Sequence, residues 1–301
     1  MPETFYDVLV IGGSYAGLSA AMALGRSRRR TLVIDSGRPC NRQTPQSHNF
    51  LTEDGTAPAA IVARAREAVA RYESVRRHAG RAVAAEPIEG GFRVHTDDGS
   101  VHEGRKLLFA TGVEDLLPPL PGFAACWGIS VLHCPYCHGY EVRDAPLGVL
   151  ANGDLAFEFA RLIRHWSADL TLFANGPATL SDAQRERLQQ RGVRIDEREL
   201  AAIRHRSGEL EALVFADGAE HALRALFARP AFRQHSDLPA RLGCALTEAG
   251  HVAVDEFGRT GVPGIFAAGD CTTMFRAVSV AVAAGTKAGA MVNKELIEEA
   301  F

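Results

Sequence analysis

The chain has 301 residues, of which 47% are hydrophobic and 23% are charged, and this composition is typical of a globular protein with a well-buried core. Its net charge of −3 gives no indication of nucleic-acid or membrane binding. No apolar run reaches the roughly 18 residues of a membrane-spanning helix, and no secretory signal precedes Tyr6, so we expect a cytoplasmic protein.

The first elements follow one another closely. An apolar run at Asp7–Ile11 leads into a glycine-rich turn and then into the small-residue segment Leu18–Leu24. This order predicts a strand, a tight turn and a helix. A second strand is expected at Thr31–Asp35, and it ends in an acid. The pattern is typical of a parallel, doubly wound α/β sheet that binds a nucleotide.

The turn itself carries a phosphate-binding pattern. Gly12 and Gly17 occupy the first and third glycine positions of G-x-G-x-x-G, while Ser14 replaces the middle glycine. Glycines allow the backbone N–H groups to approach a pyrophosphate, which the helix N-terminus also attracts. Asp35 lies near the spacing expected for an acid that binds a ribose hydroxyl. A plain connecting turn is the alternative, but strand, helix and acid together favour a dinucleotide site.

The middle of the first half predicts a hairpin, a strand and a break. Alternating apolar residues from Phe92 to Val101 surround an Asp-Asp-Gly turn. Another strand is expected at Leu107–Gly112. The proline-rich stretch Pro118–Gly122 then interrupts regular structure and is a candidate linker.

A second strand-turn-helix unit follows the linker. We expect a strand at Leu147–Leu150, a helix at Phe157–Trp166 and another strand at Leu170–Phe173. The chain is expected to cross back near Ala228–Phe232. A small-residue helix is predicted from Val278 onward.

Two of the six cysteines are close together. Cys134 and Cys137 form a Cys-x-x-Cys pair, followed directly by His138. Two intervening residues allow both sulfurs to close a small disulfide ring, and an imidazole can exchange a proton near neutral pH. Zinc binding lacks a second cysteine pair, and a purely structural disulfide is unusual in a cytosolic chain. Haem attachment also matches the pattern but requires export, so redox use is favoured and no metal is expected.

Together these motifs resemble the low-molecular-weight thioredoxin reductases. The resemblance covers nearly the whole chain and rests on Ile11–Gly17, Ala110–Gly112, the cysteine pair and Ala268–Asp270. It implies an FAD domain at 1–116 and 236–301, around an inserted NAD(P)-like domain at 117–235 that carries the cysteines. It also implies a homodimer, with Asp270 at the FAD ribityl chain and the following helix N-terminus near the flavin ring.

The expected FAD contacts form one set. Asn41 and His48 belong to it by analogy with a family loop, although a plain polar loop is the alternative, and Arg276 belongs by position alone. The full set is Gly12, Ser14, Tyr15, Ala16, Gly17, Asp35, Asn41, His48, Thr111, Gly112, Gly269, Asp270, Arg276, Ala277 and Val278.

Two departures from thioredoxin reductases bear on the direction of electron flow. The second glycine motif reads Ala151-Asn152-Gly153-Asp154, and the position of the basic cluster reads Ala174–Gly176, without positive charge. Phosphate recognition normally uses Arg or Lys, so the NADPH site looks degraded. NADPH bound through Arg161 or Arg164 is the alternative.

The second departure is His138, where thioredoxin reductases carry an aspartate. The string Cys-Pro-Tyr-Cys-His-Gly-Tyr-Glu resembles the dithiol oxidases of gliotoxin- and holomycin-type biosynthesis. We therefore expect an enzyme that oxidises a small-molecule dithiol through Cys134, Cys137 and His138, with FAD as cofactor and O₂ as electron acceptor. The alternative for His138 is a surface position without a role. A thioredoxin reductase-type disulfide reductase and a non-catalytic flavin redox sensor are the other interpretations.

Overall fold

The computed structural model describes residues 5–301 and divides the chain into two compact units. Unit 1 comprises the described part of Met1–Arg42 with Asn49–Glu114 and Phe232–Phe301, and unit 2 comprises Gln43–His48 and Asp115–Ala231. The expected domain limits, 1–116 with 236–301 and 117–235, lie close to this division and stay a prediction. No helix within residues 5–301 is both long and apolar enough to cross a membrane.

Unit 1 is built around a seven-stranded sheet in the order β3-β2-β1-β6-β5-β4, with β17 paired to β6. β1 pairs in parallel with both β2 and β6, which is the doubly wound arrangement that the sequence predicts. The elements are β1 Tyr6–Ile11, α1 Tyr15–Arg26, β2 Thr31–Asp35, α2 Pro58–Ala70, β3 Val75–Ala79, β4 Ala82–Ile88, β5 Gly91–Thr96, β6 Val101–Phe109, α7 Leu238–Arg241, β17 Ile265–Ala267 and α8 Val278–Glu298. The short strands β7 (Val113–Asp115) and β16 (Phe232–Gln234) pair with each other.

Both faces of this sheet are buried. Val8 and Val10 pack into the cluster that includes α1 and α8, whereas Leu9 and Ile11 pack into the cluster on the opposite face. Successive side chains of a strand point to opposite faces, so a strand covered on both sides needs an unbroken apolar run. This requirement explains the continuous apolar run from Val8 to Ile11 in β1.

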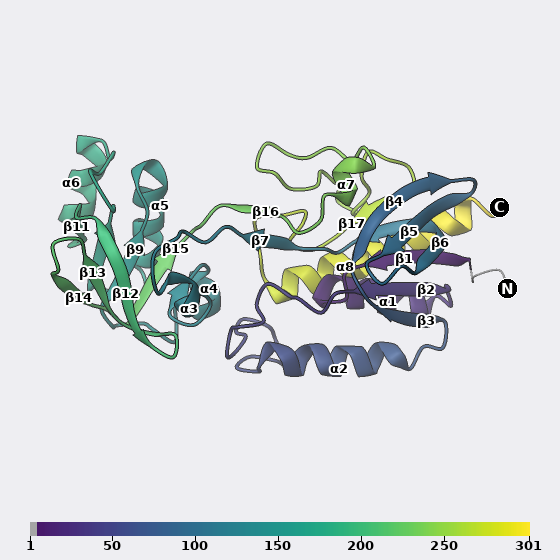
Figure 1. The fold of residues 1–301 in the computed structure, drawn as a ribbon, viewed down its shortest axis with the longest axis horizontal. Helices are drawn as coiled ribbons and strands as arrows, with labels where there is room; N and C mark the ends of the chain where they lie inside the picture. Colours follow the sequence, from purple (N-terminus) through teal and green to yellow (C-terminus); the bar gives the residue numbers. More distant parts are fainter. Residues whose placement is uncertain (1–4) are drawn as a thin grey trace. The chain divides into compact units, whose positions relative to one another are not determined.

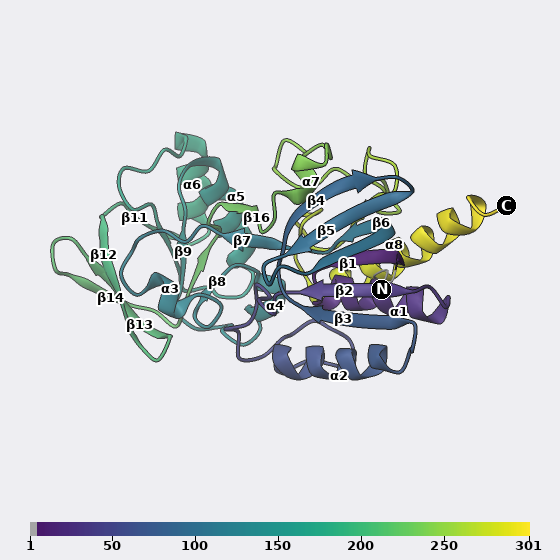
Figure 2. The same cartoon turned by 45° about the vertical axis from the view of Figure 1, so that its right-hand side comes forward.

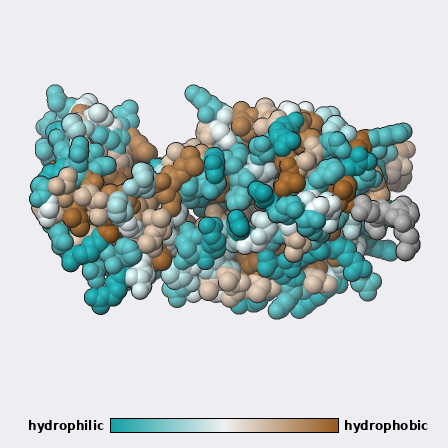
Figure 3. Space-filling model, in the orientation of Figure 1, coloured by the Kyte–Doolittle hydropathy of each residue, from teal (hydrophilic) through white to brown (hydrophobic). Residues whose placement is uncertain are grey.

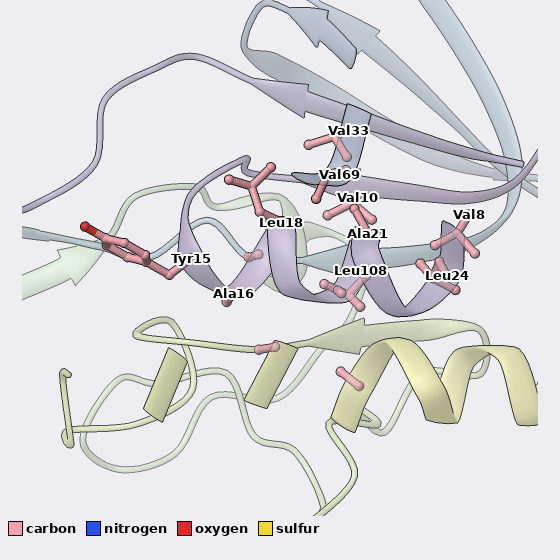
Figure 4. Packing of buried hydrophobic residues seen from close by; sticks show 14 of the residues in the cluster. Val8, Val10, Tyr15, Ala16, Leu18, Ala21, Leu24, Val33, Val69 and Leu108 are labelled. Carbon is pink, nitrogen blue, oxygen red and sulfur yellow. The ribbon is translucent and has the colours of Figure 1, made fainter. Parts of the chain in front are cut away.

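Helices α1 and α8 lie side by side and approach closely (Figure 1, Figure 4). A Cβ on Gly285 would collide with the backbone of Ala16, and one on Gly289 would lie 2.7 Å from the Ala20 oxygen. The hydroxyl of Ser19 donates to the Val282 oxygen at 2.8 Å across this contact. The small residues of the last helix therefore permit this close approach. Leu18 and Leu24 of α1 are buried in the same core cluster, each worth about 1.5–3 kcal/mol.

Unit 2 contains a parallel five-stranded sheet in the order β11-β10-β9-β15-β8 and an antiparallel ribbon, β12-β13-β14, which Figure 2 shows at its edge. Polar and apolar side chains are interspersed on the face seen in Figure 3. The elements are α3 Phe123–Cys126, β8 Val131–Leu132, α4 Pro135–His138, β9 Leu147–Leu150, α5 Gly153–Ile163, β10 Leu170–Phe173, α6 Asp182–Gln190, β11 Arg194–Asp196, β12 Leu200–Arg206, β13 Glu209–Phe215, β14 Glu220–Ala222 and β15 Ala225–Ala228.

One predicted helix is wrong in its limits. The helix expected at Phe157–Trp166 begins at Gly153 and ends at Ile163. It begins early because the Asn152 side chain accepts a hydrogen bond from the Gly153 N–H and caps the helix. It ends early because the N–H groups of His165 and Trp166 bond to carbonyls three residues back, in a tighter turn.

Candidate active site

The cysteine pair lies on the one-turn helix α4. Cys134 caps this helix, Pro135 is its first residue, and the N–H groups of Cys137 and His138 both reach the Cys134 oxygen at 3.2 Å. Proline suits a first helical position because the N–H that it lacks would have no partner there. The turn brings the two cysteine Cα atoms to 5.3 Å, and the sulfurs form a disulfide. Both residues are half-buried, which leaves the disulfide open to an incoming thiol.

Aromatic side chains hold and flank this turn. The rings of Tyr136 and Trp166 meet edge to face, with centroids 5.5 Å apart. Gly139 follows α4 so closely beneath the indole that a Cβ there would lie 2.7 Å from Trp166 Nε1. A side chain at position 139 would therefore displace either the indole or the turn. Tyr136 and Tyr140 are exposed beside the disulfide.

His138 lies against a second histidine from a distant part of the chain. His48, in the segment 43–48 of unit 2, places its ring 6.1 Å from that of His138, at an interplanar angle of 89°. His48 Nδ1 is 3.5 Å from Oε1 of Glu141. Burial, and secondarily the charge of His48, lower the pKa of His138 to about 4. The His138 imidazole is consequently neutral near physiological pH and keeps one nitrogen as a proton acceptor.

In unit 1, the glycine turn after β1 leaves a helix N-terminus open. Gly12 has a φ of +107°, and a Cβ there would collide with the backbone of Ala110. Ser14 caps α1 without any side-chain hydrogen bond to the first-turn N–H groups. Those N–H groups have no partner within the helix, so they are available to a pyrophosphate. The serine in the middle glycine position therefore leaves these N–H groups uncapped by a side chain.

Asp35 lies over the same turn. A Cβ on Gly13 would come 2.8 Å from the Asp35 side chain, which is only 10% exposed. One carboxylate oxygen accepts from Arg66 at 2.8 Å, and the other accepts from the Gly37 N–H at 3.1 Å. Sequence reasoning missed Arg66, because nothing in the pattern of α2 distinguishes this arginine from its neighbours.

A polar group gathers around Asp270, also within unit 1. Oδ2 of Asp270 accepts from the Cys40 thiol at 3.6 Å and lies 3.8 Å from Arg276 Nε. The Asn41 amide donates to the Tyr15 hydroxyl at 3.2 Å. Burial raises the pKa of Tyr15, so this hydroxyl stays protonated. Figure 4 shows Tyr15 at the start of α1 with its hydroxyl directed away from the aliphatic core.

These features fit a bound dinucleotide. Gly269, at φ +85°, would place a Cβ 2.8 Å from the Cβ of Ala16, so the segment that carries Asp270 meets the start of α1. The buried Thr111 hydroxyl has no conventional hydrogen-bond partner among the described residues, and only the weakly bonding thiol of Cys271 lies beside it. A cofactor such as FAD fits these three features. Its pyrophosphate would accept from the open helix N-terminus, a ribose hydroxyl would meet the acid over the turn, and a polar atom would bond the buried hydroxyl.

The second nucleotide fold differs at the equivalent helix. Oδ1 of Asn152 accepts from the N–H groups of Gly153 and Thr179, each at 2.8 Å. Its amide donates to the Pro177 oxygen at 2.9 Å, which ties the loop after β10 to the start of α5. Asp154 sits in the first turn of the helix and accepts from Gln184. A carboxylate and a side-chain cap therefore lie where a pyrophosphate would bind.

The expected residues divide between the two units. All expected FAD contacts except His48 belong to unit 1, whereas His48 belongs to unit 2 and contacts His138 there. Their roles as FAD contacts stay predictions. Glu141, which pairs with His48, was not singled out from the sequence, although it stands in the same motif as the cysteines. Among residues 5–301, no group of three or more His, Cys, Asp or Glu side chains could hold a metal ion.

Unit 1 combines a doubly wound sheet with features that fit a dinucleotide, and unit 2 is a second nucleotide fold that carries a disulfide. This combination is that of a flavin-dependent disulfide oxidoreductase. The chain belongs to the pyridine nucleotide-disulphide oxidoreductase family, whose model matches residues 6–285. The resemblance to thioredoxin reductase-like flavoproteins and the predicted fold class are thereby confirmed. The protein is an oxidoreductase with FAD as its cofactor, and it acts on a dithiol or disulfide.

Several similar proteins are known. Thioredoxin reductase tcpT of Claviceps purpurea (strain 20.1) is 36% identical over 304 residues, which cover 97% of this chain and 95% of tcpT. The structure of an oxidoreductase from Agrobacterium tumefaciens has a TM-score of 0.92 at 38% identity, covering 98% and 99% of the two chains. The structure of HlmI has a TM-score of 0.92 at 34% identity, covering 98% and 94%.

Proposed function

We propose that this flavoprotein oxidises a small-molecule dithiol to a disulfide through Cys134 and Cys137, with O₂ as the final electron acceptor. The observation that carries the direction is the side-chain cap on α5. An enzyme that draws electrons from NAD(P)H must bind its pyrophosphate, usually at a helix N-terminus such as this one. Here Asn152 already bonds the first N–H of that helix.

The two nucleotide folds of the chain provide an internal comparison. α1 begins without any side-chain cap, in keeping with an anion site. α5 begins with a cap that is also bonded to Thr179 and with Asp154 in its first turn. The charge of Asp154 adds repulsion toward a phosphate at the position where α1 offers none.

The two arginines considered for NADPH binding have other partners. Arg164 donates to the main-chain oxygens of Arg191 and Ser167, which fixes the turn after α5. Arg161 pairs with Glu158 at 2.9 Å on the exposed side of the helix. Such an exposed pair is worth little, so Arg161 is the more available of the two. Neither arginine replaces the backbone N–H group at the start of α5 that the Asn152 side chain already occupies.

The proposed reaction begins with thiol-disulfide exchange. A substrate thiolate attacks the Cys134 sulfur and displaces Cys137 as a thiolate, which forms a mixed disulfide. The second substrate sulfur then attacks this mixed disulfide, so that the substrate leaves as a disulfide and both cysteines are reduced. His138, neutral at working pH, accepts a proton from a substrate thiol. Bound FAD would supply the two-electron chemistry that links the reduced cysteines to O₂, with peroxide as the product.

Anaerobic mixing tests the direction. The FAD-loaded protein is mixed with excess NADPH, with NADH or with dithiothreitol, and the absorbance of oxidised flavin near roughly 450 nm is followed. We expect bleaching by dithiothreitol alone, reversed on admission of air with formation of peroxide. Rapid bleaching by NADPH or NADH would refute the proposal. Cys134→Ser and Cys137→Ser should retain FAD and lose bleaching by the dithiol.

A disulfide reductase is the second candidate. It is favoured by the names of relatives such as thioredoxin reductase tcpT and the thioredoxin reductase of Gibberella zeae, which is 31% identical over 339 residues. In that case electrons would run from NAD(P)H through FAD to the cysteines and then to a protein or peptide disulfide. The same anaerobic experiment distinguishes the two directions.

We also propose a cytoplasmic homodimer. The dimer rests on the family resemblance alone, and analytical ultracentrifugation tests it. The location is supported by Cys126, Cys244 and Cys271, which are buried thiols outside the disulfide, since reduced cysteines are usual in reducing compartments.

A further inference from the structure

We infer that His48 and Glu141 are positioning residues for the proposed reaction: they take over, through His138, the proton that a substrate thiol releases. This inference rests on the proposed dithiol oxidation and adds two residues to it. All three side chains belong to unit 2, and His138 and Glu141 stand in or just after α4.

His138 by itself cannot store the proton. Burial disfavours the charged imidazole, so a proton held on His138 is costly there. A thiol of ordinary acidity gives up its proton to such a ring only if the proton moves on quickly. The proton therefore needs a second acceptor within reach of the His138 ring.

His48 is placed to be that second acceptor. Its ring meets that of His138 edge to face at a centroid distance of 6.1 Å, a separation that one water molecule between the two rings would bridge. The His48 side chain is 14% exposed, so the exchange takes place largely away from bulk solvent.

Glu141 supplies the countercharge. Its Oε1 lies 3.5 Å from His48 Nδ1, on the ring that receives the proton. A carboxylate beside an imidazole fixes the ring orientation and stabilises the imidazolium, as it does in catalytic triads on other folds.

The overall exchange balances without another reactant. The substrate loses two S–H protons and an electron pair and forms one S–S bond, while the Cys134–Cys137 bond breaks and both sulfurs become reduced. The proton abstracted at the first attack passes from His138 to His48, and the displaced Cys137 thiolate is protonated afterwards from the same pair. The proton of the second substrate thiol goes to the Cys134 thiolate that the second attack displaces. The cluster thus carries a proton out of and back into the site within one exchange.

Stopped-flow reduction of the FAD-loaded protein by dithiothreitol, without oxygen, tests this role. Glu141→Gln keeps the shape but removes the countercharge, and His48→Gln removes the acceptor ring. We expect each to slow flavin bleaching by about 10- to 100-fold and to raise its solvent deuterium isotope effect, because proton transfer becomes limiting. Glu141→Asp should restore most of the rate. Glu158→Gln, which removes an exposed glutamate of α5, is the matched control and should behave as wild type.

The outcomes separate this inference from the proposed function. If dithiothreitol does not bleach the wild type, the proposed direction fails. If it bleaches the wild type and both variants at the same rate and isotope effect, only the positioning role is overturned. A slower rate with an unchanged isotope effect, or with a lowered melting temperature and FAD content, would also overturn it, since a purely structural defect produces that result.

Discussion

The buried imidazole of His138 makes the stability of the protein depend on pH in a defined window. Its pKa is about 4 in the folded chain, against 6.5 for an unperturbed histidine. The unfolded chain therefore binds more protons between these two values, so stability falls as the pH drops from about 6.5 toward about 4. Above this window the group contributes no pH dependence.

The magnitude follows from the same two values. Linkage gives a loss of about 2 kcal/mol between pH 7 and pH 5, approaching about 3 kcal/mol near pH 4. His138→Gln removes the group and with it this part of the pH dependence. The assay is urea unfolding of the oxidised wild type and variant at several pH values, taking the difference in free energy at each pH so that other groups cancel.

We expect this difference to shift by about 2 kcal/mol in favour of the variant on going from pH 7 to pH 5. A surface control, His165→Gln, should leave the profile of the wild type unchanged, because His165 is exposed. Parallel profiles for wild type and His138→Gln would show that His138 is not held neutral by burial, and its assignment as a proton acceptor would fail as well.

Three further predictions concern unit 1. Gly285→Val forces a side chain into the backbone of Ala16 and should lower the free energy of unfolding by more than about 2 kcal/mol, with a loss of bound FAD. Ala283→Val, at an exposed position of the same helix, should change neither quantity. Melting curves and the flavin content of the purified proteins measure both effects. Asp35→Asn should weaken FAD binding to the apoprotein by about tenfold or more, measured by fluorescence titration; unchanged affinity would exclude a ribose contact. Cys271, whose pKa burial raises to about 11, should resist iodoacetamide in the folded protein, and its alkylation in mass spectra before unfolding would contradict the burial.

The local parts of the fold were predictable from sequence because each depends on neighbouring residues. The run at Tyr6–Ile11 had to be a doubly covered strand, since apolar residues fill both alternating faces. The two-residue spacing between Cys134 and Cys137 is also local, and it correctly indicated that both cysteines lie on one turn.

The long-range parts were not predictable. His48 and His138 are 90 positions apart, and no periodicity connects a polar loop to a helix so far along the chain. Arg66 reaches Asp35 from α2 for the same reason. The start of α5 is hard to predict because Asn152-Gly153 resembles a degraded glycine motif, whereas the asparagine also serves as a helix cap.

The division of unit 1 into separate stretches of chain has a consequence for biosynthesis. β17 and α8, which complete the sheet and cover α1, come from the last stretch, Phe232–Phe301. The segment Asp115–Ala231 of unit 2 is synthesised before them and can fold while they are still absent. The predicted FAD contact Asp270, and Gly269, which meets Ala16, emerge from the ribosome only after that segment, so the predicted cofactor site is complete only once translation is nearly complete.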